Sequence, residues 1–319
     1  MRYQVFGGCL DSALAFPSLP PAIETVPTSW RLLLGNAPAP DVATSELRSV
    51  QLSDDLAVRI ATAGRRLRVS FTDTGDYELS ADTRTITWYR SPDADLTNAR
   101  IDVLGTLLTL ALHLRGQLTL HGSAVATEDG VIAFLAPSGY GKSTLAMSLT
   151  LAGARFMSDD AVPVRVLGTE VIASPGVPSP RFREDAFARF VRDLPAASTD
   201  SNGKVSLGDR LDDDVVEARE RPLAGLYVLN PVIREIAASP SRAPVAPTMA
   251  TIALMQNAKL AKLLWAEESA RLLTMVAEVA RRAPVWRLDV PRDLDLLPAV
   301  AEQLLDWHGS AARGVTSRP

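Results

Sequence analysis

Cysteine and histidine are scarce in this chain of 319 residues. Cys9 is the only cysteine, and the three histidines are His113, His121 and His308. A single cysteine excludes an intrachain disulfide and a cysteine-ligated metal cluster, and so few histidines give no indication of a zinc site. Because proteins of reducing compartments use cysteine sparingly, we expect a cytoplasmic protein.

Long hydrophobic runs and an excess of basic residues are also missing. The longest apolar run, residues 103–114, includes Thr and His and is far shorter than the roughly 20 residues that a membrane-spanning helix needs. The N-terminal residues contain no continuous apolar segment of the kind found in signal peptides. Lys and Arg number 33 against 37 Asp and Glu, which gives a net charge of −4. With no overall positive charge to attract nucleic acid or a membrane surface, we expect neither as a partner.

The overall composition is that of an ordinary soluble globular protein, with 47% hydrophobic and 22% charged residues. At roughly 100–200 residues per domain, the length predicts one large or two modest domains. Residues 1–96 carry short runs of β-branched and aromatic residues separated by Pro, Gly, Asp and Ser, which predicts a small β-rich domain. The expected strands are residues 3–6, 30–34, 56–60, 67–71 and 85–89.

From residue 97 the pattern changes to helices that alternate with buried strands. Asp95 or Thr97 can cap a helix that continues to about residue 114. A further helix is expected at residues 143–152, ended by Gly153. Strands are expected at residues 118–120, 123–126, 131–135 and 155–158. The sequence therefore predicts a mixed α/β domain over residues 97–308, followed by a loose tail at residues 309–319.

Residues 136–144, which read APSGYGKST, fit the phosphate-binding loop pattern G-x-x-x-x-G-K-[ST], with Ala136 in the position of the first glycine. The context fits as well, because an apolar strand is expected before the loop and a helix after it. Two glycines let the backbone bend so that its N–H groups converge on phosphate oxygens, and the helix N-terminus adds its dipole. The candidate nucleotide-binding residues are Ser138, Gly139, Tyr140, Gly141, Lys142, Ser143 and Thr144.

Two residues of this loop have individual predicted roles. Lys142 should reach the β- and γ-phosphates of a nucleotide, which makes it a catalytic residue as well as a binding one. The hydroxyl of Ser143 should bind Mg²⁺. The loop therefore predicts a nucleotide and Mg²⁺ as cofactors.

Asp159 and Asp160 lie 17 and 18 residues after Lys142, where the expected strand 155–158 ends. Two adjacent acids facing a phosphate loop can divide two tasks, because one can hold Mg²⁺ while the other accepts a proton from an attacking hydroxyl. Spacing alone leaves open which acid does which. His121 ends an expected strand before the loop, where a histidine considered alone is more often structural.

These segments resemble the HPr kinase/phosphorylase superfamily, bacterial serine kinases whose catalytic domain is related to phosphoenolpyruvate carboxykinase. Three blocks carry the resemblance: residues 120–125 (LHGSAV), residues 137–144 (PSGYGKST) and residues 153–160 (GARFMSDD). The blocks resemble the family closely, and the rest of the kinase domain resembles it loosely. The resemblance implies a P-loop serine kinase domain of this type, with ATP and Mg²⁺ as cofactors.

The resemblance also implies roles for individual residues. Asp159 would be the general base, Asp160 a metal ligand, and His121 would lie near the transferred phosphate. Arg181 and Lys204 become candidates for phosphate or substrate contacts. Because the HPr kinases are oligomers, a homo-oligomer is one alternative for an assembly that the sequence leaves open.

The chain departs from the HPr kinases proper, since their signature of a Glu and Arg-Gly-Leu-Gly after the two acids is absent. In its place residues 174–182 read SPGVPSPRF, which is similar to HPr-kinase-related proteins encoded with peptide natural products, among them the lasso peptide kinases. The resemblance therefore implies an ATP-dependent serine kinase whose acceptor is a peptide or small protein. The C-terminal serine of a lasso peptide precursor is the specific expectation.

Two alternatives use the same residues. A kinase of the same chemistry could act on a small metabolite, or the chain could be a nucleotide-binding regulator with little transfer activity. The base candidate Asp159 argues against the regulator, because a protein that only binds a nucleotide needs no base. No Asn-Lys-x-Asp motif follows the loop to favour a GTPase, and the lysine within the loop argues against a nicotinamide site.

Overall fold

The computed structural model describes residues 1–54, 56–184, 186, 188, 196–199, 205–207, 211–232 and 239–309. The chain divides into two compact units. The first is formed by Met1–Thr119 and Ala258–Val276, and the second by Leu120–Asn257 and Ala277–Pro319. This division differs from the expected boundary at residues 96/97, because the helices that follow residue 96 group with the first unit. The expected tail at residues 309–319 lies, apart from Gly309, outside the described residues.

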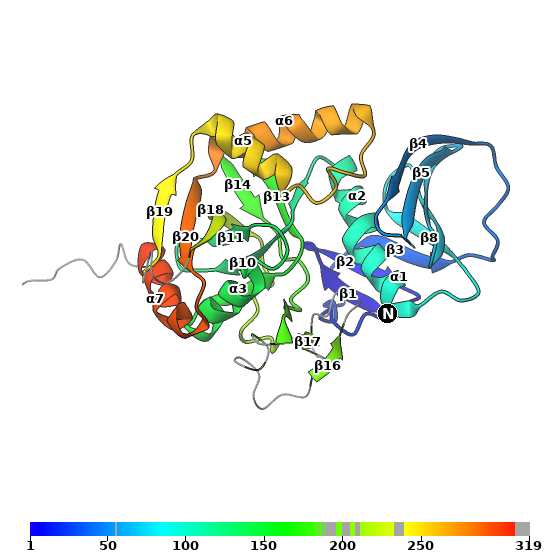
Figure 1. Ribbon diagram of the computed structural model, residues 1–319. Helices are drawn as coiled ribbons and strands as arrows, with labels where there is room; N and C mark the ends of the chain where they lie inside the picture. The colour runs from blue at the N-terminus through cyan, green and yellow to red at the C-terminus, as the bar shows by residue number, and fades with distance from the viewer. Residues whose placement is uncertain are drawn as a thin grey trace, which may run out of the picture. The chain divides into compact units, whose positions relative to one another are not determined.

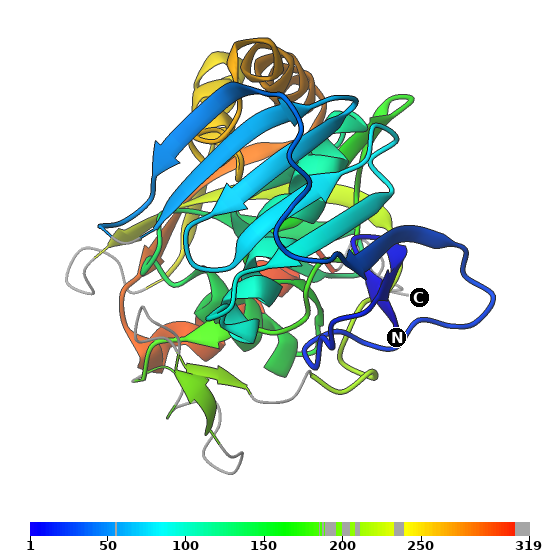
Figure 2. The same ribbon diagram turned by 90° about the vertical axis from the view of Figure 1, so that its right-hand side faces the viewer.

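The first unit contains an eight-stranded sheet with the strand order β1-β2-β3-β8-β7-β6-β5-β4. Its strands run from dark blue to cyan in Figure 1, and Figure 2 looks onto the sheet. They are β1 (Arg2–Val5), β2 (Gly8–Ser12), β3 (Thr28–Leu34), β4 (Thr44–Gln51), β5 (Ala57–Ala63), β6 (Arg66–Phe71), β7 (Gly75–Leu79) and β8 (Thr85–Arg90). All five strands expected in this region are present, and β2, β4 and β7 are additional. Trp88 of β8 stacks on Tyr77 of β7, with ring centroids 5.7 Å apart, in the buried layer of the sheet.

Three consecutive helical segments follow this sheet: α1 (Leu96–Asp102), the π-helical turn η1 (Val103–Leu107) and α2 (Leu108–Leu114). Asp95 caps α1 as expected, since its Oδ1 accepts hydrogen bonds from the backbone N–H groups of Thr97 at 2.7 Å and Asn98 at 2.9 Å. At the other end of α1, the buried carboxylate of Asp102 accepts a 2.6 Å hydrogen bond from the Thr74 hydroxyl. This contact fastens α1 to the loop before β7.

The second unit contains a mixed sheet with the order β12-β10-β11-β18-β14-β13, to which β20 and β19 are added beside β18. The chain passes from the first unit to the second within β9 (Leu118–Leu120). The other strands are β10 (Gly122–Ala126), β11 (Val131–Leu135), β12 (Arg155–Ser158), β13 (Val162–Leu167), β14 (Glu170–Ala173), β18 (Arg221–Val232), β19 (Ser241–Pro244) and β20 (Val285–Pro291). A separate three-stranded sheet joins β15 (Arg181–Phe182), β17 (Val205–Leu207) and β16 (Ala196–Thr199).

Three neighbouring strands of this sheet, β11, β18 and β20, run parallel to one another. All five residues of β11 are buried, as a continuous apolar strand in the middle of a sheet requires. Because the strands are parallel, their carboxyl ends meet at one edge, which is where ligands bind in open α/β sheets. The chain leaves β11 at this edge and begins α3 (Lys142–Leu151) after one loop.

The remaining helices are α5 (Pro247–Gln256), α6 (Ala266–Arg282), the short 3₁₀ turn η2 (Leu294–Leu296) and α7 (Leu297–Trp307). Helix α7 packs along α3, and the hydroxyl of Ser148 donates a 3.2 Å hydrogen bond to the carbonyl of Leu297. This packing holds the start of α3 beside the ends of the parallel strands. Among the described residues, no helix combines the length and apolar character needed to cross a membrane. The architecture is mixed α/β, as the sequence predicts.

Candidate functional site

The glycine-rich loop (residues 136–144) connects the buried strand β11 to α3. Gly139 and Gly141 have φ angles of 85° and 90°, in the left-handed region that side chains disfavour. An added Cβ at either glycine would meet no atom within 4 Å, so the backbone conformation and not crowding requires glycine. Gly141 caps α3 without any side-chain hydrogen bond, which leaves the first-turn N–H groups of the helix to other partners. The loop is thus suited to receive an anion.

Lys142 opens α3 and is buried, with 6% of its surface exposed. Its Nζ donates hydrogen bonds to the carbonyl oxygens of Ala136 at 2.8 Å and Pro137 at 3.1 Å, both in the same loop. A buried ammonium is costly unless it has strong acceptors or an anion nearby. The loop therefore holds a positive charge against its own backbone, beside the N-terminus of a helix.

Asp159 lies directly after β12, and its carboxylate accepts hydrogen bonds from three other segments of the chain. Its Oδ1 accepts hydrogen bonds from the hydroxyls of Ser143 at 2.8 Å and Ser123 at 2.5 Å. Its Oδ2 accepts one from the backbone N–H of Arg181 at 3.0 Å. The carboxylate is buried, and its three donors come from α3, β10 and β15. Asp159 thus connects the glycine-rich loop to two other segments of the second unit.

Asp160 has a different environment from its neighbour. Its φ angle of 68° lies in the left-handed region, and its side chain contacts other groups than that of Asp159. One carboxylate oxygen lies 3.1 Å from Nδ1 of His121, and the other lies 3.3 Å from a guanidinium nitrogen of Arg181. About one-third of its side chain is exposed (32%). Asp160 is therefore the accessible acid of the pair, held between two basic groups.

The segment that carries Arg181 is fitted tightly against the end of β12. Val177 accepts a 3.0 Å hydrogen bond from the N–H of Asp159. A Cβ added at Gly176 would lie 1.9 Å from Oγ of Ser158 and 2.6 Å from the carbonyl oxygen of Ala161. Only glycine allows this approach, which brings the backbone N–H of Arg181 to Asp159.

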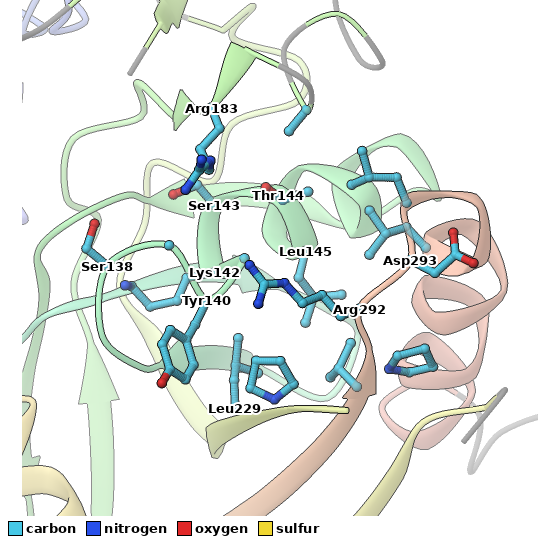
Figure 3. A pocket seen from close by; sticks show the side chains of 18 of the residues that line it. Ser138, Tyr140, Lys142, Ser143, Thr144, Leu145, Arg183, Leu229, Arg292 and Asp293 are labelled. Atoms are coloured by element: carbon cyan, nitrogen blue, oxygen red, sulfur yellow. The ribbon is translucent and has the colours of Figure 1, made fainter. Parts of the chain in front are cut away.

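A cavity of about 660 Å³ opens on the glycine-rich loop, and Figure 3 shows the side chains around it. Its lining includes all seven candidate nucleotide-binding residues, Ser138 to Thr144. Arg181 and Arg183 also line it. The lining also includes residues in the last part of β18, in the last part of β20 and after β20, which were not predicted: Leu229, Asn230, Pro231, Val290, Pro291, Arg292, Asp293, Leu294 and Leu297.

The structure brings most of the predicted site residues together. The loop residues, His121, Asp159, Asp160 and Arg181 form one connected group. Lys204 lies outside the described residues, so its expected contact stays a prediction. The acid next to the Ser143 hydroxyl is Asp159, whereas the family resemblance implies Asp160 as the metal ligand. Ser123 is a further residue at the site that the sequence analysis did not assign. Arg183, which follows Arg181 in the segment expected to bind the acceptor, also lines the cavity.

The oxygen atoms of Ser143 and Asp159 suit Mg²⁺, which prefers hard oxygen ligands and keeps several positions for water and phosphate. Within the described ranges, no group of three or more His, Cys, Asp or Glu residues could hold a metal ion by itself. A magnesium ion here would therefore take its other ligands from a bound nucleotide and water, as is usual for this metal.

The sequence matches no protein-family model and no curated protein. Among solved structures, the HPr(Ser) kinase/phosphatase from Coxiella burnetii aligns with 60% of this chain and 95% of its own, at 15% sequence identity. The TM-score of this alignment is 0.33, which is too low to establish a common fold. The functional assignment therefore depends on the site itself.

Proposed function

We propose that this chain is an ATP-dependent phosphotransferase that transfers the γ-phosphate to a serine hydroxyl of a peptide or small protein. The observation that carries the proposal is the 2.8 Å contact between the Ser143 hydroxyl and the buried Asp159 carboxylate, at the start of the helix that follows the glycine-rich loop. A loop Ser and a strand-end Asp are the pair that holds Mg²⁺ in P-loop proteins.

The glycine-rich loop would hold the phosphates of ATP. Its backbone N–H groups and the N-terminus of α3 favour anions, and Lys142 supplies a full positive charge. To reach the β- and γ-phosphates, Lys142 would exchange the carbonyls of Ala136 and Pro137 for phosphate oxygens. That exchange replaces two neutral acceptors with charged ones, which form stronger hydrogen bonds.

Ser143 and Asp159 would hold Mg²⁺, which supplies charge neutralisation on the phosphates when bound. Both groups are already in place, because Asp159 is fixed by Ser123 and by the backbone of Arg181 as well as by Ser143. Preorganised groups of this kind need little rearrangement when the substrate binds.

Asp160 is the acid that we assign to proton transfer, which reverses the division of roles implied by the family resemblance. A general base must reach the acceptor hydroxyl, and Asp160 is the exposed member of the pair. His121 and Arg181 orient its two oxygens. In the transfer, a bond forms between the serine oxygen and the γ-phosphorus while the bond from that phosphorus to the β–γ bridging oxygen breaks. The serine proton passes to Asp160, and ADP leaves.

The acceptor is proposed to be a peptide, with the C-terminal serine of a lasso peptide precursor as the specific candidate. Arg181 and Arg183 both line the cavity, and Arg181 lies beside the accessible acid. Guanidinium groups pair with carboxylates in a directional, two-pronged manner, so these arginines could receive a peptide C-terminus. The sequence from residue 174 to residue 182 supports this choice through its resemblance to peptide-modifying kinases.

A transfer assay with labelled ATP tests the proposal. The acceptor panel comprises a serine-ended peptide, its C-terminal amide, its Ser→Ala variant, free sugars and free nucleosides, each with Mg²⁺ and with EDTA. We expect Mg²⁺-dependent labelling of the serine-ended peptide and none of the Ser→Ala variant. Labelling of a sugar or nucleoside alone would favour a metabolite kinase, and ATP hydrolysis without any acceptor would favour a nucleotide-binding regulator.

A further inference from the structure

Arg292 directly follows β20 and lines the cavity that opens on the glycine-rich loop. Its backbone N–H donates a 2.7 Å hydrogen bond to the carbonyl of Val232, which ties it to the end of β18. The side chain lines the same cavity as Tyr140 and Lys142. In Figure 3 it extends from the strand end toward the glycine-rich loop.

The guanidinium of Arg292 forms no ion pair and no hydrogen bond with the part of the chain that the structure describes. Other arginines of this region are satisfied within the protein. Arg287, on the same strand, lies 3.1 Å from a carboxylate oxygen of Asp289. Arg242 lies over the rings of Trp286 and Trp307, at 4.7 and 4.6 Å from their centroids.

Asp293, the acidic neighbour of Arg292 in the sequence, caps the turn that follows it. The carboxylate of Asp293 accepts a 2.9 Å hydrogen bond from the N–H of Asp295 and thereby caps the turn η2. The arginine therefore lines a cavity whose loop side carries the start of α3, the ammonium group of Lys142 and the hydroxyls of Ser138, Tyr140, Ser143 and Thr144. A set of donors and positive charges around one cavity indicates an anionic ligand.

We propose that Arg292 binds the phosphate groups of the donor nucleotide from the side opposite Lys142. This inference rests on the proposed function, since it names a further ligand for the same nucleotide. A guanidinium offers two parallel N–H groups that match two phosphate oxygens, which an ammonium cannot do. Placed at the end of β20, it would stabilise the charge that develops on the phosphates during transfer. The sequence motif gives no sign of it, because Arg292 lies 150 residues after Lys142.

The test compares Arg292→Gln and Arg292→Lys with the matched control Arg287→Gln, whose arginine lies on the same strand but outside the cavity. Affinities are measured for Mg·ATP and for Mg·tripolyphosphate, which carries the phosphates without a nucleoside. We expect Arg292→Gln to weaken both ligands by about 10–100-fold, the scale of a hydrogen bond to a charged group. Arg292→Lys should recover part of the loss, and Arg287→Gln should bind like the wild type.

The affinities of the Arg292→Gln variant decide whether Arg292 binds the phosphates. Unchanged affinity of a folded Arg292→Gln variant, verified by its circular dichroism spectrum and melting temperature, would overturn the inference. A loss of affinity for Mg·ATP without a loss of affinity for Mg·tripolyphosphate would also overturn it, because the arginine would then contact the nucleoside. Failure of the wild-type protein to bind Mg·tripolyphosphate would overturn it for the same reason. If the wild-type protein bound no ATP at all, the proposed function would fail and the role of Arg292 with it. Wild-type binding with an unaffected variant removes the role of Arg292 alone.

Discussion

The hydroxyl of Ser143 lies 2.8 Å from Oδ1 of Asp159, although the two residues belong to different elements, α3 and the end of β12. This contact places a carboxylate at the point where the glycine-rich loop becomes a helix. In the proposed function this carboxylate would hold Mg²⁺ together with the Ser143 hydroxyl, a role that a glycine-rich turn without a bound nucleotide would not need.

Asp159→Asn and Asp160→Asn should cause different defects in nucleotide binding and phosphate transfer. Asp160→Asn should keep Mg·ATP binding but lose transfer by about 10²–10⁴-fold, the usual contribution of a general base. Asp159→Asn should weaken Mg·ATP binding and raise the Mg²⁺ concentration needed for activity, because it changes the ligand beside Ser143. Titrations of ATP and Mg²⁺ against both variants measure the difference. Identical defects would refute the division of roles, and the opposite pattern would restore the division that the family resemblance implies.

Gly176→Ala should impair transfer while leaving the fold intact. The added methyl would lie 1.9 Å from Oγ of Ser158, so the segment must move away from β12. That shift would draw the backbone N–H of Arg181 from Asp159, and small misplacements of catalytic groups cost up to about 10²-fold in rate. The transfer rate measures the effect. Gly105→Ala is the control, since a Cβ at Gly105 would approach only Lys259, at 3.9 Å. Equal rates for the two variants would contradict the positioning role.

Arg181→Ala should raise the KM for the acceptor peptide, or lower kcat with it, more than it changes basal ATP hydrolysis. The substitution removes the guanidinium that lies 3.3 Å from Asp160 but keeps the backbone N–H that binds Asp159. Both rates are measured with a serine-ended peptide and with its C-terminal amide. Arg165→Ala on β13, which removes an ion pair with Glu220, is the control. An equal effect on hydrolysis and transfer would show that Arg181 does not act on the acceptor.

Asp102 should make the first unit less stable as the pH rises. Burial raises the pKa of its carboxyl to about 7, well above the ordinary value. The folded chain therefore holds this proton at pH values where the unfolded chain has lost it, so the contribution to stability is fully present below about pH 4 and falls as the pH approaches 7. Asp102→Asn, which is neutral throughout, should remove this slope and should gain about 1–4 kcal/mol over the wild type at pH 8.

Urea unfolding of the wild type and Asp102→Asn at pH 5 and pH 8 measures this linkage. The exposed Asp93, replaced by Asn, is the control, and its variant should follow the wild type at both pH values. Parallel pH profiles for the wild type and Asp102→Asn would contradict the assignment of the slope to this carboxyl.

The local elements around the site could be predicted from the sequence because each carries a strong local pattern. Strands 131–135 and 155–158 are found at the expected residues, and the helix expected at residues 143–152 runs from Lys142 to Leu151. A continuous apolar run before a Gly-rich loop leaves few other interpretations. By contrast, β4 is mostly exposed, so it has no alternation of buried and exposed residues by which to recognise it.

The part of the cavity lining formed by β18, by β20 and by the residues after β20 could not be predicted, because sheet topology brings these segments beside the glycine-rich loop. Leu229 and Arg292 reach the loop through the parallel pairing of β18 with β11 and β20, over a long separation in sequence. The different environments of Asp159 and Asp160 could not be predicted either, since the left-handed backbone conformation of Asp160 is not visible in the sequence. Sequence spacing places both acids at the strand end but cannot say which one turns toward Ser143.

The most direct test of the account is phosphate transfer from γ-labelled ATP to a serine-ended peptide by the wild type and by Lys142→Ala. Lys142 is the only charged side chain within the glycine-rich loop, and its ammonium donates hydrogen bonds to the carbonyls of Ala136 and Pro137. We expect Mg²⁺-dependent labelling of the peptide by the wild type. In Lys142→Ala the transfer rate should fall by at least about 10²-fold, with an unchanged circular dichroism spectrum. Normal turnover by Lys142→Ala would contradict the account.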